Sequence, residues 1–189
     1  AIIASEFQFF PLTACQFIGN TAGSSGGAIH NSSSWMADGL FNCLFVENKA
    51  GGTGSGGAVN YGNPGLHVYG SMFVRNSAGG GSGGAVSPAN ANAFIKINDS
   101  IFVGNLSKNQ GGAINLGGRA LYARNCLLAG NAATNGHGGG AYLSPYAGAY
   151  QATLTNCTFS RNWARFSGGG QTGVDGRAIT NVNCIFWGN

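Results

Sequence analysis

The chain has 189 residues with 35 glycines, 4 prolines and 43% apolar residues, and this composition argues against disorder and, without a Gly-X-Y period, excludes collagen. Charged residues make up only 7% of the chain, against about 25% in an average globular domain, so few side chains are available for acid–base catalysis. The net charge of +4 comes from cations scattered along the sequence, and no apolar run reaches the roughly 18 residues of a membrane span, so we expect neither a nucleic-acid partner nor a transmembrane segment.

The chain opens with residues 1–10, which are largely apolar and contain no polar capping element. From residue 17 an aromatic residue or leucine followed by x-x-Asn recurs, and the intervals between successive asparagines are 28, 28, 29, 26, 31 and 27 residues. The copies read Phe17 to Asn20, Phe45 to Asn48, Phe73 to Asn76, Phe102 to Asn105, Leu128 to Asn131, Phe159 to Asn162 and Phe186 to Asn189. Self-similarity at this period predicts a repeat architecture that fills residues 1–189 as one domain.

A second motif of small residues follows the first with the same period. Its copies are Gly26-Gly27-Ala28-Ile29, Gly56-Gly57-Ala58-Val59, Gly83-Gly84-Ala85-Val86, Gly111-Gly112-Ala113-Ile114, Gly139-Gly140-Ala141-Tyr142 and the degenerate Gly169-Gly170-Gln171-Thr172. A coil of about 28 residues is too short for a βαβ unit, and no helical periodicity survives across the copies. We therefore predict an all-β fold, a parallel β-helix (a three-sided β-solenoid) of about seven coils.

The first predicted side of each coil carries an apolar pair such as Leu66 and Val68, and it ends at a sharp bend. The bend column comprises Ala14, Asn42, Gly70, Asp99, Asn125, Asn156 and Asn183. Six of these seven residues are Asn, Asp or Gly, which tolerate a left-handed backbone. Asp99 is therefore best explained as a substitute for asparagine.

The second side carries a phenylalanine column, formed by Phe17, Phe45, Phe73, Phe102, Phe159 and Phe186. It ends at an asparagine column, formed by Asn20, Asn48, Asn76, Asn105, Asn131, Asn162 and Asn189. Stacked amides at one corner can each donate to the next carbonyl oxygen along the axis, which satisfies buried polar groups. The third side is the Gly-Gly-Ala-Ile segment, where the sequence leaves open whether Ala or Ile points inward.

All five cysteines fall in one slot of the coil, which Ser71 and Ser100 share: Cys15, Cys43, Cys126, Cys157 and Cys184. In-register neighbours in a parallel sheet lie about 4.8 Å apart, which keeps their Cβ atoms beyond the usual disulfide separation of about 3.8 Å. We therefore expect buried free thiols.

The few acids do not form a catalytic pattern. They are Glu6, Asp38, Glu47, Asp99 and Asp175, and they fall at different positions of the coil. Glycoside hydrolysis needs two carboxylates within about 5–9.5 Å, and a calcium site needs several convergent oxygens. His30, His67 and His137 also fall at three different coil positions, whereas a zinc site needs three or four converging ligands. We expect no catalytic residues, no metal and no cofactor.

The pairing of Gly-Gly-Ala-Ile with F-x-x-N, together with the segment Leu154-Thr155-Asn156-Cys157-Thr158-Phe159, resembles the repeats of the polymorphic outer-membrane protein family. It is also similar to the wider group of secreted right-handed parallel β-helix repeat proteins. The resemblance covers essentially the whole chain and departs in the last coil, at Gln171-Thr172. It implies a right-handed helix, export and an extracellular location at the cell surface.

From these features we expect a non-catalytic extracellular structural element: a rigid surface rod, or a subunit that stacks end to end into a filament. Solenoids need caps, and an uncapped parallel edge can pair with another chain, so the expected partner is a flanking β-helix or another copy of the chain. One alternative is an adhesin passenger whose irregular segment, Ser144 to Gln151, binds glycan or a host protein. Another is a β-helix similar to polysaccharide lyases or hydrolases.

Overall fold

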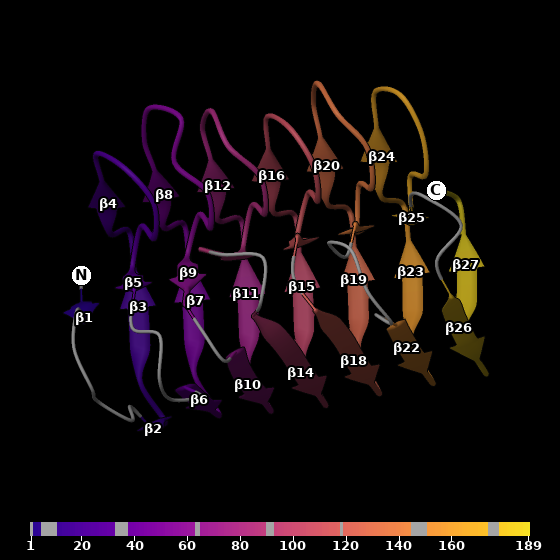
Figure 1. The fold of residues 1–189 in the computed structure, drawn as a ribbon, viewed down its shortest axis with the longest axis horizontal. Coiled ribbons are helices and arrows are strands. Elements are labelled where there is room, and N and C mark those ends of the chain that lie inside the picture. The colour runs from indigo at the N-terminus through magenta and orange to yellow at the C-terminus, as the bar shows by residue number, and fades with distance from the viewer. Residues whose placement is uncertain are drawn as a thin grey trace.

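A computed structural model describes residues 2–4, 11–32, 38–62, 65–89, 93–117, 119–144, 151–173 and 178–189. Within these ranges the chain forms strands and turns and no helix. The backbone winds through about six turns, and successive turns lie side by side along the long axis (Figure 1). The protein is an all-β parallel β-solenoid.

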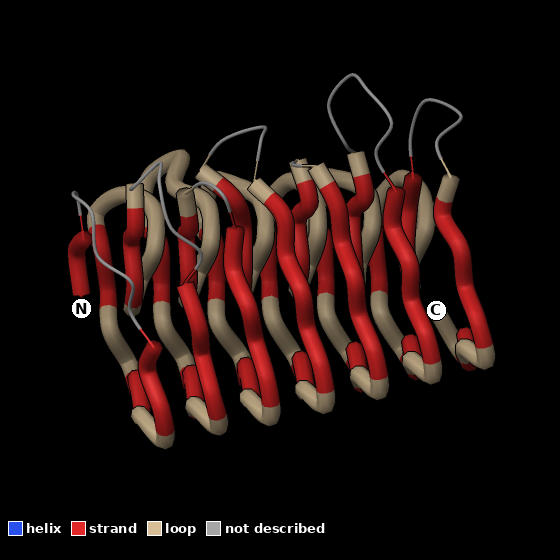
Figure 2. Tube along the Cα trace, turned by 60° about the horizontal axis from the view of Figure 1, so that its bottom comes forward, coloured by secondary structure: helices blue, strands red, loops and turns tan. Residues whose placement is uncertain are grey.

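Strands at the same position in successive coils pair in parallel and form four sheets, which Figure 2 shows as stacked rows. Sheet A contains β1 (Ile2–Ala4), β5 (Ile29–Asn31), β9 (Val59–Tyr61), β13 (Val86–Pro88), β17 (Ile114–Leu116), β21 (Ala141–Leu143) and β25 (Gln171–Gly173). Sheet B contains β2 (Pro11–Thr13), β6 (Asp38–Phe41), β10 (Gly65–Tyr69), β14 (Phe94–Asn98), β18 (Ala120–Arg124), β22 (Gln151–Thr155) and β26 (Ile179–Val182). Sheet C contains β3 (Gln16–Ile18), β7 (Leu44–Val46), β11 (Met72–Val74), β15 (Ile101–Val103), β19 (Leu127–Ala129), β23 (Thr158–Ser160) and β27 (Ile185–Trp187). Sheet D contains β4 (Thr21–Ala22), β8 (Lys49–Ala50), β12 (Ser77–Ala78), β16 (Leu106–Ser107), β20 (Ala132–Ala133) and β24 (Trp163–Ala164).

Sheets A, B and C correspond to the three predicted sides, and sheet D is a short fourth ladder that the sequence did not indicate. It forms directly after the asparagine column, where the chain stays extended for two residues. There the Lys49 N–H donates to the carbonyl of Asn20 at 2.8 Å, and the Gly51 N–H donates to that of Ala22 at 2.8 Å. Backbone amides leaving the corner need acceptors, and the preceding coil supplies them.

The register of sheet A corrects two predicted alignments. Ile114 pairs with Ala141, so the fifth copy of the glycine motif begins at Gly138 and the predicted start at Gly139 is wrong by one residue. Ala141 in turn pairs with Gln171, so the sixth copy begins at Gly168 and the predicted start at Gly169 is wrong by one residue as well. Three consecutive glycines conceal the register, because any two of them match the motif. The shift places Gly140 where the preceding coils have alanine, and a Cβ there would lie 2.9 Å from the ring of Phe159.

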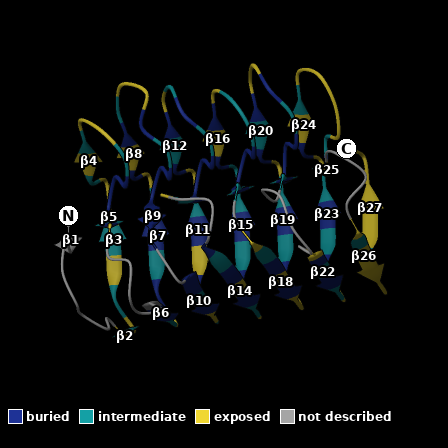
Figure 3. Cartoon of the chain, in the orientation of Figure 1, coloured by how far each residue is buried: buried dark blue, intermediate teal, exposed yellow. Residues whose placement is uncertain are grey.

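The core runs through the centre of the coils and contains both residues that the sequence left open. Ala58 and Val59, the third and fourth residues of their motif, are 0% and 1% exposed. In the interior coils the strands of sheet A are mostly buried and each strand of sheet C buries its middle residue, whereas all three residues of β27 in the last coil are exposed (Figure 3). Because each inner coil covers its neighbours, burial depends on the next coil along the axis.

Candidate functional site

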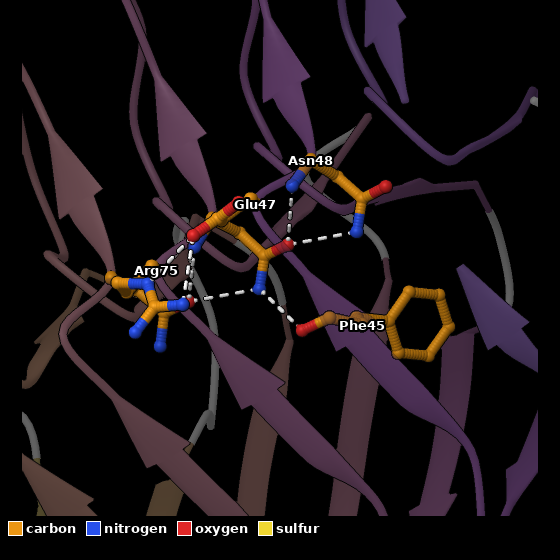
Figure 4. Close-up of polar contacts among 6 residues, drawn as sticks. Phe45, Glu47, Asn48 and Arg75 are labelled. Carbon is orange, nitrogen blue, oxygen red and sulfur yellow. Dashed lines mark hydrogen bonds and ion pairs between the residues drawn. The ribbon is translucent and has the colours of Figure 1, made fainter. Parts of the chain in front are cut away.

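The asparagines that close the F-x-x-N motifs form one continuous column at the corner between sheets C and D. The backbone N–H and the side-chain Nδ2 of Asn48 both donate to Oδ1 of Asn76 at 2.9 Å (Figure 4). Nδ2 of Asn76 in turn donates to the carbonyl of Phe45 at 3.1 Å. The same bonds recur from coil to coil up to Asn189. Each inner amide, from Asn48 to Asn162, therefore links its own coil to both neighbours.

The phenylalanine rings stack face to face in the core. The ring centroids of Phe17 and Phe45 lie 4.8 Å apart, and those of Phe45 and Phe73 lie 4.7 Å apart, with interplanar angles of 5° and 2°. The stack continues to Phe102, is interrupted at Leu128, and resumes between Phe159 and Phe186 at 4.8 Å. The aromatic column is thus divided into two segments, with a buried leucine between them.

All seven residues of the bend between sheets B and C have a left-handed backbone, with φ between 50° and 59°. Hydrogen bonds also link three successive side chains of this bend. Nδ2 of Asn125 donates to Oδ1 of Asp99 at 2.8 Å, and Nδ2 of Asn156 donates to Oδ1 of Asn125 at 3.1 Å. Asp99 therefore takes the place of an asparagine as a hydrogen-bond acceptor.

Sequence reasoning missed a second bend, immediately before the asparagine column. Its residues have φ between 52° and 65° and are Gly19, Glu47, Arg75, Gly104, Gly130, Arg161 and Gly188. Glycine at four of the seven copies was the available signal, and the three charged residues obscured it. Nη2 of Arg75 contacts Oε1 of Glu47 at 2.8 Å across the coils (Figure 4). Both side chains are more than half exposed, so this ion pair contributes little to stability.

The cysteines occupy one column and are all unpaired, three of them buried and two partly exposed. Ser71 and Ser100 continue the column, with the Cys43 N–H donating to Oγ of Ser71 at 3.0 Å. Burial raises the pKa of the Cys43 thiol. A hydrogen bond from Cys126 holds the pKa of Cys157 below its usual range, and the same bond raises the pKa of Cys126.

The structure brings no two carboxylates together among the side chains that it describes. Glu47 lies at the second bend, whereas Asp99 lies at the first bend two coils later. Glu6, Asp175 and the side chain of Asp38 lie outside the described residues. In the described ranges no three His, Cys, Asp or Glu side chains come together as metal ligands would.

The histidines have separate surroundings. His30 lies on β5 and His67 on β10, while Nδ1 of His137 lies 2.6 Å from Oγ of Ser167. Burial and, to a smaller extent, the charge of Lys96 lower the pKa of His67.

The outer face of sheet B gathers aromatic and basic side chains. Nζ of Lys96 lies 5.6 Å from the ring centroid of Phe94 and 6.0 Å from that of Tyr122. The ring of His67 lies 5.5 Å from that of Phe94. These side chains come from three successive coils, so only the stacking of the coils brings them together. The irregular segment named for the alternative adhesin role, Ser144 to Gln151, has its residues 145–150 outside the described ranges.

Comparison with known protein families identifies the type of repeat. The family model of the Chlamydia polymorphic membrane protein repeat matches residues 14–32, a stretch that contains Phe17 to Asn20 and Gly26 to Ile29. The chain carries polymorphic membrane protein-type β-helix repeats. Searches of curated proteins and of solved structures returned no significant match.

The polymorphic membrane protein-type repeats explain why the two short motifs alternate. One motif builds the Phe and Asn columns of sheet C, and the other builds the tightly packed glycine corner that leads into sheet A. The family points to association with the outer membrane or the cell surface. Among the described residues, no helix has the length and apolar character to cross a bilayer.

Proposed function

We propose that this chain is a non-catalytic structural element of a cell surface, a rigid rod built from polymorphic membrane protein-type repeats. The continuous column of asparagine amides carries the proposal. Each inner amide bonds to the coil before it and the coil after it, so neighbouring coils cannot shift against each other without leaving buried groups unpaired. Repetition of this link favours a stiff, elongated body.

We further propose that the rod continues beyond these coils, into a flanking β-helix or another copy of the chain. In the last described coil Ile185 is 60% exposed, Phe186 43% and Trp187 64%, whereas Phe159, one coil earlier, is 0% exposed. One more coil on that face would cover these side chains and extend the columns. A head-to-tail contact of this kind does not close into a ring and therefore builds a filament.

Light scattering over a range of concentrations and electron microscopy of the purified chain test the self-stacking version. We expect concentration-dependent rods, and we expect Phe186→Asp to prevent them by placing a charge on the stacking face. The variant Lys108→Gln, at an exposed position in the middle of the solenoid, is the control and should still assemble. Monodisperse particles at every concentration would leave the flanking β-helix as the partner.

The alternatives have unequal support. Among the described side chains, the carboxylates of Glu47 and Asp99 lie two coils apart, so these two do not form the acid pair that a polysaccharide hydrolase uses. An adhesin role is compatible with the same surface location, and it depends on whether an outer face of the rod can bind a ligand.

A further inference from the structure

Three neighbouring strands of sheet B present a continuous outer surface. Strands β10, β14 and β18 pair in register and lie side by side (Figure 1). Leu66, Ile95 and Leu121 share one row of the register and are at most 1% exposed, so this row points inward. Side chains alternate along a strand, so the adjacent rows point outward.

The outward rows contain the six residues that we call the aromatic–basic face: His67, Tyr69, Phe94, Lys96, Tyr122 and Arg124. His67, Lys96 and Tyr122 form one row, and Tyr69, Asn98 and Arg124 form the next. Tyr69 is 48% exposed and Tyr122 37%, so ring surface remains accessible to a ligand. With coils about 4.8 Å apart, the face extends roughly 10 Å along the solenoid axis.

Contacts within the face hold its side chains in place. Lys96 lies over the rings of Phe94 and Tyr122, and Nε2 of Gln151 donates to the Tyr122 hydroxyl at 3.3 Å. A lysine held between two rings has already lost much of its rotamer freedom, which lowers the entropic cost of binding an anion.

The charge of the face is positive and unmatched. Lys96 and Arg124 are exposed, and neither forms an ion pair among the described residues. Asp99, whose carboxylate is one of those described, lies at the bend after β14 and accepts a hydrogen bond from Asn125.

We propose that the aromatic–basic face binds an anionic polysaccharide along the axis of the solenoid. Exposed aromatic rings provide flat apolar surfaces against which the C–H faces of sugar rings pack. The ammonium and guanidinium groups bind the carboxylate or sulfate groups of the polymer. The open, flat sheet suits an extended chain, and the two cations are too few for the many phosphate contacts of a nucleic acid. This inference adds a ligand to the structural role and does not require the rod to assemble.

Titration calorimetry with the intact chain at about 0.1 M salt, where the Debye length is about 10 Å, provides the test. The probes are polygalacturonate for carboxylates, dextran sulfate for sulfates, neutral dextran and a single-stranded DNA oligonucleotide. We expect binding to at least one of the two anionic polysaccharides and none to neutral dextran. The double variant Lys96→Gln/Arg124→Gln should weaken that binding at least about tenfold, which corresponds to about 1.4 kcal/mol.

A matched double variant separates a local site from general charge attraction. Lys49→Gln/Lys108→Gln removes the same charge from exposed positions on and beside sheet D, and it should leave the affinity within about twofold. Tyr122→Ala should also weaken binding without changing the net charge. Circular dichroism establishes that each variant is folded. The proposal is overturned if neither anionic polysaccharide binds, if both double variants lose affinity equally, or if DNA binds more tightly than both polysaccharides.

Discussion

At the scale of single residues, the shape of each coil depends on two features: the left-handed backbone of its bends and the buried asparagine amide. Left-handed bends on either side of sheet C turn the chain sharply, and the buried amide after the second bend joins the coils. Natural residues at these positions are not all optimal, because Ala14, Glu47 and Arg75 adopt the left-handed conformation at a steric cost. Substitutions in the amide column should therefore lower the stability of the fold, and a glycine at a bend now occupied by another residue should raise it.

Removing one amide from the asparagine column should destabilise the fold strongly. Oδ1 of Asn105 accepts two bonds from Asn76, and its Nδ2 donates to the carbonyl of Phe73 at 2.9 Å. Asn105→Ala leaves these buried groups unpaired, and we expect a loss of about 3 kcal/mol in the free energy of unfolding, measured by urea denaturation. The control Asn98→Ala, on the outer side of β14, should change it by less than about 0.5 kcal/mol. Equal losses would show that the column does not stabilise the coils.

A glycine at a left-handed bend should stabilise the fold. Ala14 has φ of 53° and is exposed, so Ala14→Gly removes the steric cost without removing buried surface. We expect a gain of about 1 kcal/mol in the free energy of unfolding. Ala132→Gly, in a strand of sheet D, should instead lose about 0.5–1 kcal/mol. If both substitutions destabilise equally, the left-handed conformation at Ala14 carries no cost.

At the scale of elements, the glycine motif fixes how closely consecutive coils approach. A Cβ at Gly84 would lie 2.1 Å from the carbonyl oxygen of Gly112 and 2.6 Å from the backbone nitrogen of Leu106. Both contacts are with backbone, which cannot move without breaking the ladders of sheets A and D. Glycine is required at Gly84 for space, whereas at Gly130 it is required for its φ of 62°.

This distinction predicts different costs for two glycine-to-alanine changes. Gly84→Ala should destabilise the chain by more than about 3 kcal/mol, because the coils must separate locally. Gly130→Ala has no atom within 4 Å of the new Cβ and should cost only about 1–2 kcal/mol. Urea denaturation of the two variants measures both values, and a larger cost at Gly130 would contradict the close-approach explanation.

At the scale of the whole molecule, stability is distributed along one axis, because each coil contacts its two neighbours. Strands β11 and β15 are each paired on both sides, whereas β27 is paired only with β23. Repeat proteins of this kind open from their ends, so local stability should decrease towards the terminal coils.

Hydrogen exchange should show this gradient directly. We expect the backbone amides of β11 and β15 to exchange only through opening of most of the chain, and the amides of β27 to exchange fastest among the strands of sheet C. Mass spectrometry of peptides from each coil measures the rates. Uniform protection in all coils would show that the solenoid opens as one cooperative unit.

The sequence alone determined the repeat, the parallel solenoid and the positions of the Phe, Asn and first-bend columns, because identical environments in successive coils select similar residues at a fixed interval. It did not determine sheet D, because strands of two residues leave too short a pattern. It did not determine the second bend, because charged residues occupy three of its left-handed positions. It did not determine the start of the glycine motif at Gly138, because any two residues in a run of glycines match the motif. Only the tertiary structure brought Lys96 and Arg124 onto one face with the rings of Phe94 and Tyr122. Which side chains become neighbours on an outer face depends on the register between coils. Because solvent-facing positions can differ from one coil to the next, they leave no repeated pattern in the sequence from which this register could be read.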